Sequence, residues 1–285
     1  MSGFARRLLK VAANERLGAY RLLRLADPHG PAPAPGQFAM LAAAARWGAG
    51  EDERPHLPRA FSIARWQDGE AHYLLEDVGP GTRRLCELRA GEDVWALAPL
   101  GVGFRPAPDD ARPLLVGGGV GIAPLAILQD GLARGRPTLD PSAQDPFLPA
   151  PREGAPVTVL LGFRDGERAH GAALLSGAQV CSDDGSVGHR GPVTDLLAHE
   201  LDRDAHATVY ACGPPAMLEA VRALCERRAV PAQLALEAGM ACGFGACFGC
   251  VVPTRGGAYA RVCVEGPVFD AARLECVQAH TGAPR

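Results

Sequence analysis

The chain has 285 residues, which is more than one hydrophobic core usually contains, so we expect two or three domains. Hydrophobic residues make up 47% of the sequence, which is enough to fill such cores. The formal net charge is −3, and acidic and basic residues are mixed along the chain without a basic run. This pattern argues against a nucleic-acid partner and against binding to an anionic membrane surface.

Several features of the sequence bear on cellular location. The first ten residues are charged, and no apolar stretch follows that would suit a signal peptide. No uninterrupted apolar run approaches the roughly 20 residues of a membrane-spanning helix. The nine cysteines are an odd number in a long chain, which does not suggest a secreted disulfide framework. We therefore expect a soluble, cytoplasmic protein whose clustered thiols bind metal.

Residues 1–108 contain short apolar or alternating segments separated by turns. The expected strands cover residues 17–25, 37–44, 60–65, 71–77 and 93–98. A short helix is expected over residues 83–89. Strands at roughly ten-residue spacing predict a small antiparallel barrel.

The pattern changes near residue 109, where strands begin to alternate with helices. The expected strands cover residues 114–116, 157–162, 180–182 and 208–211, and the expected helices cover 124–134, 193–199 and 215–228. A further short helix is expected at Leu174 and Leu175, and residues 138–156 form a proline-rich loop. This alternation predicts a parallel, doubly wound sheet.

The C-terminal part, from about residue 231, contains the most informative motif. Cys242, Cys247 and Cys250 follow the C-x4-C-x2-C spacing of plant-type [2Fe–2S] ferredoxins, and Cys263 supplies a fourth thiol. The intervening glycines allow tight turns that direct amide N–H groups at sulfur. A zinc site or four buried structural thiols are the alternatives, although zinc sites usually pair two C-x2-C units or include histidine.

Two glycine turns in the middle of the chain suggest a dinucleotide site. The first contains Gly117, Gly118, Gly119 and Gly121, and the second contains Cys212, Gly213 and Pro214. Each follows an expected strand and precedes a helix, where backbone N–H groups can approach a pyrophosphate. A plain tight turn is the alternative for each. Cys212 is either a buried packing thiol or a residue that faces a nicotinamide ring.

A third element lies in the expected barrel. Arg59 and Ser62 lie on one strand, and Gly81 and Thr82 begin a helix. Together they suit a diphosphate, because a guanidinium, a hydroxyl and an amide can form charge-assisted hydrogen bonds with it. Taken alone, the first segment is only a strand that begins with a charged residue.

We assign no catalytic residue in this chain. The histidines show no metal-ligand spacing, and no Ser/His/Asp or Cys/His order is evident. Asp183 and Asp184 belong to a polar loop that could also contact a ribose. Arg164 would accept a 2′-phosphate and Asp165 would repel one, so the choice between NAD and NADP stays open.

These motifs together give the chain a clear resemblance. It resembles the electron-transfer subunits of two-component, NAD-linked dihydroorotate dehydrogenases, within the ferredoxin–NADP reductase superfamily. The matching segments are residues 35–38, 59–62, 79–82, 91–93, 98–104, 117–124, 183–186, 211–214 and 237–250. The last segment is the most specific, since the short gap to Cys263 also fits. Residues 43–58 and 136–156 depart from the pattern as insertions, and Ala60 replaces a common proline.

The resemblance implies three domains and three cofactors. These are an FAD-binding β-barrel over residues 1–108, an NAD-binding Rossmann-like domain over 109–230 and a [2Fe–2S] domain over 231–285. The residues implied to bind FAD are Arg59, Ala60, Phe61, Ser62, Leu74, Leu75, Glu76, Gly81 and Thr82. Those implied to bind NAD are Gly117, Gly118, Gly119, Gly121, Cys212, Gly213 and Pro214. The implied cluster ligands are Cys242, Cys247, Cys250 and Cys263.

The resemblance also implies a function in pyrimidine biosynthesis. A partner subunit containing FMN would oxidise dihydroorotate, and electrons would pass through the [2Fe–2S] cluster and FAD to NAD+, in a two-plus-two heterotetramer. One alternative is an NAD(P)H–ferredoxin reductase subunit of a hydrogenase or transhydrogenase complex. Others are a cofactor-free, zinc-stabilised scaffold and a redox-sensing regulator.

Overall fold

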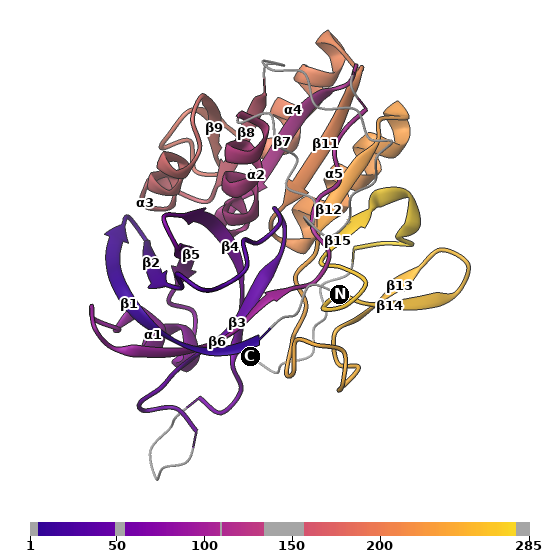
Figure 1. Cartoon of the computed structure of the whole chain (residues 1–285). Coiled ribbons are helices and arrows are strands. Elements are labelled where there is room, and N and C mark those ends of the chain that lie inside the picture. The colour runs from indigo at the N-terminus through magenta and orange to yellow at the C-terminus, as the bar shows by residue number, and fades with distance from the viewer. Residues whose placement is uncertain (1–4, 49–54, 109, 134–156, 278–285) are drawn as a thin grey trace.

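The structure, a computed structural model, describes residues 5–48, 55–108, 110–133 and 157–277. A closed antiparallel barrel occupies the lower left of Figure 1, and a larger sheet with helices lies above it. The predicted combination of a barrel, a doubly wound sheet and a small C-terminal region is confirmed. The predicted loop over residues 138–156 and the whole of the predicted insertion 136–156 lie outside the described residues.

The barrel has six strands in the order β1-β2-β5-β4-β3-β6. They are β1 (Ala5–Leu17), β2 (Tyr20–Ala26), β3 (Phe38–Ala43), β4 (Arg59–Gln67), β5 (Glu70–Glu76) and β6 (Asp93–Leu100). The prediction missed β1 and started the next strand too early. Gly18 has a φ of 57° and forms the turn between β1 and β2, so residues 17–25 are not one strand.

One helix, α1 (Pro80–Cys86), follows β5 and begins three residues before the predicted start. Pro80 suits the first helical position, where a backbone N–H has no helical partner. At the other end, the Asn14 side-chain amide donates to the carbonyl oxygens of Leu85, Cys86 and Leu88 at 3.1, 3.1 and 2.9 Å. These bonds fix the end of α1 against β1.

The second sheet has seven strands in the order β10-β9-β8-β7-β11-β12-β15. They are β7 (Arg112–Gly118), β8 (Thr158–Phe163), β9 (Ala178–Ser182), β10 (His189–Arg190), β11 (Ala207–Cys212), β12 (Ala232–Ala235) and β15 (Val268–Asp270). All pairs are parallel except β12 with β15. The order reverses at β7, where the chain leaves one half of the sheet for the other, and ligands of such sheets bind at this point.

Helices cover both faces of this sheet, as a doubly wound fold requires. They are α2 (Ala123–Ala133), α3 (Gly166–Ala169), α4 (Val193–Arg203) and α5 (Pro215–Arg228). Leu197 of α4 and Val221 of α5 share one core with β7 and β11, whereas Leu125 of α2 belongs to the core on the other face. The buried face of α5 consists of Leu218, Val221, Leu224 and Cys225.

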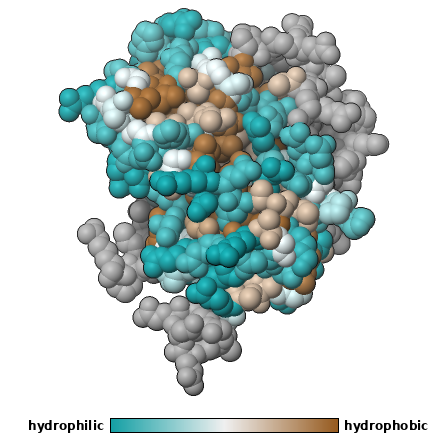
Figure 2. All heavy atoms as spheres, turned by 90° about the vertical axis from the view of Figure 1, so that its left-hand side faces the viewer, coloured by the Kyte–Doolittle hydropathy of each residue, from teal (hydrophilic) through white to brown (hydrophobic). Residues whose placement is uncertain are grey.

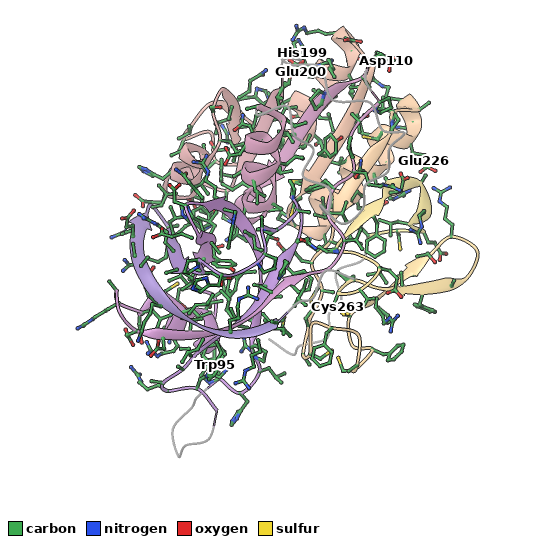
Figure 3. The ribbon with its side chains drawn as sticks, viewed as in Figure 1. Trp95, Asp110, His199, Glu200, Glu226 and Cys263 are labelled. Carbon is green, nitrogen blue, oxygen red and sulfur yellow. The ribbon has the colours of Figure 1, made fainter. Side chains whose placement is uncertain are left out.

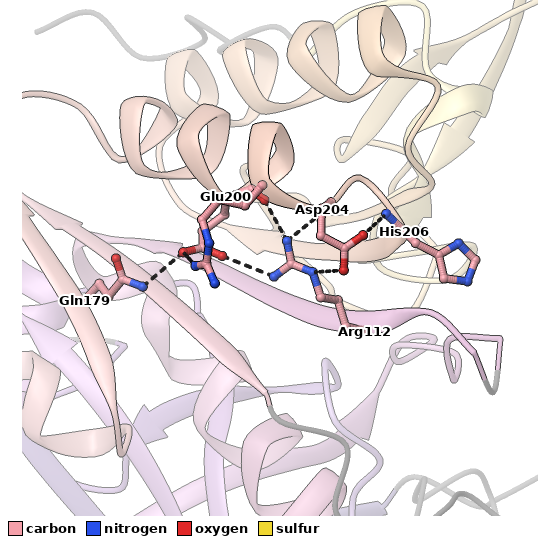
Figure 4. Close-up of polar contacts among 6 residues, drawn as sticks. Arg112, Gln179, Glu200, Asp204 and His206 are labelled. Carbon is pink, nitrogen blue, oxygen red and sulfur yellow. Dashed lines mark hydrogen bonds and ion pairs between the residues drawn. The ribbon is translucent and has the colours of Figure 1, made fainter.

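A buried carboxylate ties α4 to the far end of this sheet (Figure 4). Glu200 is 3% exposed and accepts from Arg112 at 3.2 Å, from Arg203 at 2.7 Å and from Gln179 at 3.4 Å. Arg112 also donates to the Asp204 carbonyl oxygen at 2.6 Å. These contacts join α4 to the start of β7 and to β9, at the end opposite the glycine turns.

The C-terminal region adds a hairpin of β13 (Val251–Thr254) and β14 (Ala258–Arg261) beside the loop that contains the cysteines. Figure 3 places Cys263 low in the molecule, far from Glu200 and His199 at the top of the sheet. The face shown in Figure 2 is mainly hydrophilic, with hydrophobic residues in smaller patches. Among the described residues, no helix is long and apolar enough to span a membrane.

Candidate functional site

The two glycine turns meet at the carboxyl ends of β7 and β11. These strands are parallel neighbours, and Gly117 pairs with Cys212. A Cβ added to Gly121 would lie 2.6 Å from the Gly213 Cα, so the turns touch through their backbones. Gly119 has a φ of 55°, which favours glycine. The sequence correctly placed both turns at one edge of the sheet.

A cavity of about 720 Å³ opens beside these turns. Its lining includes Gly118, Gly119, Gly121, Gly213 and Pro214 from the predicted set. Gly117 and Cys212 do not line it, and the Cys212 side chain is only 2% exposed. Burial, together with the nearby Glu237 carboxylate, raises the pKa of Cys212 well above its usual value.

Polar residues from the sheet and the barrel complete this cavity. Arg164 and Asp183 line it at the ends of β8 and β9. Asp165 is engaged elsewhere, because it accepts from the Arg168 amide at 2.9 Å and from the Arg168 guanidinium at 2.6 Å. The same guanidinium pairs with Glu76 of the barrel at 2.9 Å. Arg168 therefore joins the two parts of the molecule at the cavity wall.

A second cavity, of about 420 Å³, lies on the barrel. The predicted residues that line it are Arg59, Ala60, Phe61, Ser62, Leu74, Glu76 and Thr82. Leu75 is fully buried in the barrel core and does not line it. A Cβ on Gly81 would lie 2.6 Å from the Arg59 Nε, so the Arg59 side chain packs directly against the Gly81 backbone. The predicted neighbours on β4 and α1 are therefore in contact.

Thr82 has local partners as well. Its hydroxyl donates to the Gly79 carbonyl oxygen and accepts from the Val78 amide, both at 2.9 Å. Arg59 donates to the Leu57 carbonyl oxygen at 2.6 Å. These bonds hold the start of α1 and the Arg59 side chain at the cavity before any ligand binds.

The two cavities share a wall. Glu76, Val78, Val120 and Glu237 line both of them. Glu237 is accessible through the cavities, yet protein atoms crowd its carboxyl group, and this desolvation raises its pKa. Molecules bound in the two cavities would therefore meet beside a carboxyl group that protonates more readily than usual.

The four predicted ligands form two pairs of thiols. The Cys250 and Cys263 sulfurs are 3.2 Å apart, and both side chains are buried. Cys242 accepts a hydrogen bond from the Cys247 thiol, and Cys247 is exposed. Cys242 also acts electrostatically on Cys263, so the two pairs lie close to each other. Cys276, the next cysteine along the chain, is half-buried.

Backbone amides prepare one of these sulfurs for metal binding. Burial raises the pKa of Cys242, but amide hydrogen bonds from Phe244, Ala246 and Cys247 outweigh it and lower the pKa to about 6. Burial and the Cys250 sulfur raise the pKa of Cys263 to about 12. Cys242 is therefore a thiolate at neutral pH, the form that binds metal.

The donor set fits a [2Fe–2S] cluster. Such clusters bind four cysteine sulfurs and accept amide hydrogen bonds at sulfur, and this region offers four cysteines and amide donors at Cys242. Within residues 5–48, 55–108, 110–133 and 157–277, no three or more His, Cys, Asp or Glu side chains already form a group that could hold a metal ion. Two neighbouring pairs of thiols suit two irons better than one tetrahedral zinc ion.

Comparisons with known proteins decide the family. Residues 237–275 match the model of the iron–sulfur cluster binding domain of dihydroorotate dehydrogenase B. The dihydroorotate dehydrogenase B (NAD(+)) electron transfer subunit of Geobacillus kaustophilus is 36% identical over 250 residues, which cover 84% of this chain and 86% of the relative. The chain belongs to the family of dihydroorotate dehydrogenase B electron transfer subunits. It is therefore an oxidoreductase subunit, and family membership implies a catalytic subunit as partner.

Further comparisons agree with the electron transfer subunit family. The electron transfer subunit of Clostridium acetobutylicum is 32% identical over 242 residues, covering 84% of this chain and 85% of the relative. A chain from the structure of NADH-dependent reduced ferredoxin–NADP oxidoreductase has a TM-score of 0.75 at 23% identity, covering 97% of this chain and 92% of that one. This likeness establishes a ferredoxin–NADP reductase-like fold.

Sequence reasoning missed several residues at the sites of this electron transfer subunit. Tyr20 on β2 lines the larger cavity, and Arg168 closes its wall. The sequence predicts Glu237 only as part of the segment 237–250, and it does not mark Arg261, which ends β14 two residues before Cys263. These residues reach their sites through contacts between distant segments, which no local motif marks.

Proposed function

We propose that this subunit passes electrons from an FMN-containing catalytic subunit, which oxidises dihydroorotate, to NAD+. The observation that supports this most directly is the spatial order of three neighbouring sites, which are the cysteine loop, the barrel cavity and the larger cavity. Cys242 follows Met240 of the barrel cavity by two residues, and the barrel cavity shares a wall with the larger cavity. When bound, FAD can exchange a hydride with a nicotinamide and single electrons with an iron–sulfur cluster.

Cys242, Cys247, Cys250 and Cys263 would hold the cluster. Leu236, Glu237, Ala238 and Met240 line the barrel cavity, and Cys242 follows only two residues later. Two residues span at most about 7 Å between Cα atoms, so the cluster would lie beside the flavin. The exposed Cys247 marks the side from which electrons would enter.

The barrel cavity would hold FAD, and the larger cavity would hold NAD. Arg59 and the start of α1 suit the diphosphate of FAD, whereas Gly119 and Gly121 allow a pyrophosphate to approach the backbone. The shared wall would bring the flavin and nicotinamide rings together and shield them from water. Asp183 would favour the ribose hydroxyls of NAD, whereas Arg164 would pair with the 2′-phosphate of NADP.

The three-domain division follows the same assignment. We assign residues 1–108 to FAD, 109–230 to NAD and 231–285 to the cluster. Strands β12 and β15 of the last segment are nevertheless hydrogen-bonded into the large sheet. The cluster region would therefore be held rigidly against the NAD-binding part.

We place the contact with the catalytic subunit around Cys247. Phe248 and Tyr259, which are 62% and 72% exposed, lie in this region of the chain. Exposed aromatic side chains are enriched at protein interfaces. The two-plus-two assembly and the cytoplasmic location stay predictions.

The experiment that tests the proposal uses the complex purified anaerobically with its partner. Wild type should contain FAD, iron and acid-labile sulfide, and should reduce NAD+ with dihydroorotate. Cys247→Ser should abolish that reaction but keep NADH oxidation by an artificial flavin acceptor. Equal dihydroorotate-dependent rates in the variant and wild type would contradict the electron path.

The visible spectrum separates the remaining alternatives. An iron–sulfur flavoprotein absorbs in the visible range, whereas a zinc-stabilised scaffold is colourless. A ferredoxin reductase of a hydrogenase or transhydrogenase would copurify with a different partner. Identification of the copurified chain therefore distinguishes it from the proposed subunit.

A further inference from the structure

Arg261 and Glu265 form a closely bonded pair next to Cys263. The Arg261 Nη2 donates to the Glu265 carboxylate at 2.7 Å, and its Nε donates to both carboxylate oxygens at 3.2 Å. The Arg261 backbone amide donates to the same carboxylate at 2.7 Å. The pair therefore encloses the turn that contains Cys263, the fourth thiol in sequence.

The other side of the Arg261 guanidinium faces the loop with the first three thiols. It lies 4.9 Å from the centre of the Phe248 ring, within the range of a cation–π interaction. Its Nη1 is 3.4 Å from the Gly245 carbonyl oxygen. Gly245 lies between Cys242 and Cys247, so one side chain contacts both segments that supply thiols.

The Phe248 backbone shows why such a contact is needed. Phe248 has a φ of 56°, which is rare for a bulky residue, and its side chain is 62% exposed. Residues hold such conformations only where their surroundings impose them. Arg261 is a neighbour that fixes the Phe248 ring, and with it the segment between Cys247 and Cys250.

We propose that Arg261 is a positioning residue of the iron–sulfur site, which rests on the proposed function. It ties the loop of Cys242, Cys247 and Cys250 to the turn of Cys263. Its positive charge also favours the reduced state of the cluster. Reduction adds one electron, and so one negative charge, to a group already surrounded by thiolates, and a nearby cation stabilises that added charge.

Glu265 gives the proposal its sharpest test. Its carboxylate compensates the Arg261 charge, so the two side chains should act on the cluster in opposite directions. Arg261→Gln should shift the midpoint potential to a more negative value, because the carboxylate remains without its cation. Glu265→Gln should shift it to a more positive value, because the guanidinium remains without its anion.

The measurement is a redox titration of the full-length flavoprotein, followed by the electron paramagnetic resonance of the reduced cluster. Arg255→Gln is the matched control, since Arg255 pairs with Glu226 on α5. It should leave the potential unchanged. Arg261→Lys should keep the potential near that of wild type but release iron to a chelator about 10-fold faster, because lysine lacks the planar fork.

Each outcome decides the inference. Opposite shifts for Arg261→Gln and Glu265→Gln support it, and shifts in the same direction or no shifts overturn it. If Arg261→Gln retains no cluster, Glu265→Gln and Arg261→Lys decide, and unaltered potential and iron release in both overturn the inference. Wild type without iron and sulfide would instead refute the proposed function, and this inference with it.

Discussion

Two buried tyrosines test how hydrogen bonding affects stability, because removal of their hydroxyl groups should change the stability in opposite directions. Tyr20 and Tyr210 are 1% and 0% exposed. The Tyr210 hydroxyl donates to the Arg105 carbonyl oxygen at 3.0 Å. The Tyr20 hydroxyl is buried and has no hydrogen-bond partner among the residues that the structure describes. Removal of the hydroxyl should therefore stabilise the protein at Tyr20 and destabilise it at Tyr210.

The magnitude follows from the cost of an unpaired group. A buried hydroxyl without a partner costs about 1–3 kcal/mol, and a paired one contributes about 1 kcal/mol. Allowing for the contacts that the oxygen atom makes, Tyr20→Phe should stabilise the ligand-free protein by about 1 kcal/mol. Tyr210→Phe should destabilise it by about 1 kcal/mol. The unfolding midpoints should move by about 2–4 °C in opposite directions.

The assay is thermal unfolding of the purified protein without nucleotide, followed by circular dichroism. Burial raises the pKa of both tyrosines, so both stay protonated at neutral pH and ionisation does not affect the comparison. Flavin content should be equal in the variants, which excludes cofactor loss as the cause. A Tyr20→Phe protein that melts as low as Tyr210→Phe would show that the Tyr20 hydroxyl is paired.

Other predictions concern the carboxylate network and the glycine turns. Glu200→Gln should lower the free energy of unfolding by about 3 kcal/mol in denaturant titrations, because Arg112 loses its buried partner. Burial raises the pKa of Glu200, but hydrogen bonds from Gln179 and Arg112 outweigh it and leave the pKa lowered. The contribution of the ionised Glu200 carboxylate to the free energy of unfolding should therefore be complete above its unfolded-state pKa. It should be lost as the pH falls through the lower folded-state pKa. Glu200→Gln should not show this pH dependence. Gly121→Ala should cost about 1–3 kcal/mol and weaken NADH binding, because the added Cβ meets backbone at 2.6 Å. Gly239→Ala, where a Cβ meets nothing within 4 Å, should retain wild-type stability in the same titration.

Local patterns predicted most of the elements because their residues alternate as burial demands. The short strands β10, β12, β13, β14 and β15 were not predicted, and neither was β1, the longest strand of the barrel. Its register with β2 shifts between Val11 and Ala13, so the alternation that marks a strand is interrupted. Its outer residues are also charged, and one face is exposed. The strand is defined by its pairing with β2 and β6, which a local pattern does not contain.

Some residues of the candidate sites are marked by local sequence motifs, and others are not. Cysteine spacing and strand-ending glycines were enough to predict which cysteines and which turns to examine, because both patterns depend on local chain geometry. Glu200 was not anticipated, since a glutamate on a polar helix is normally solvated. Arg261 and Tyr20 gain their places from contacts between segments far apart in sequence. Arg261 and Tyr20 can therefore be assigned to the sites only from the tertiary structure.

The spacing of the three sites depends on one stretch of chain, residues 236–242. It leaves β12, forms part of the wall of both cavities and ends at Cys242. Immediately after it, Gly243 packs against Met40 of β3, where a side chain would clash. The sheet, the barrel and the cysteine loop are thus held together by consecutive residues. Changes that lengthen this stretch should separate the sites without unfolding any of them, and would slow electron passage more than cofactor binding.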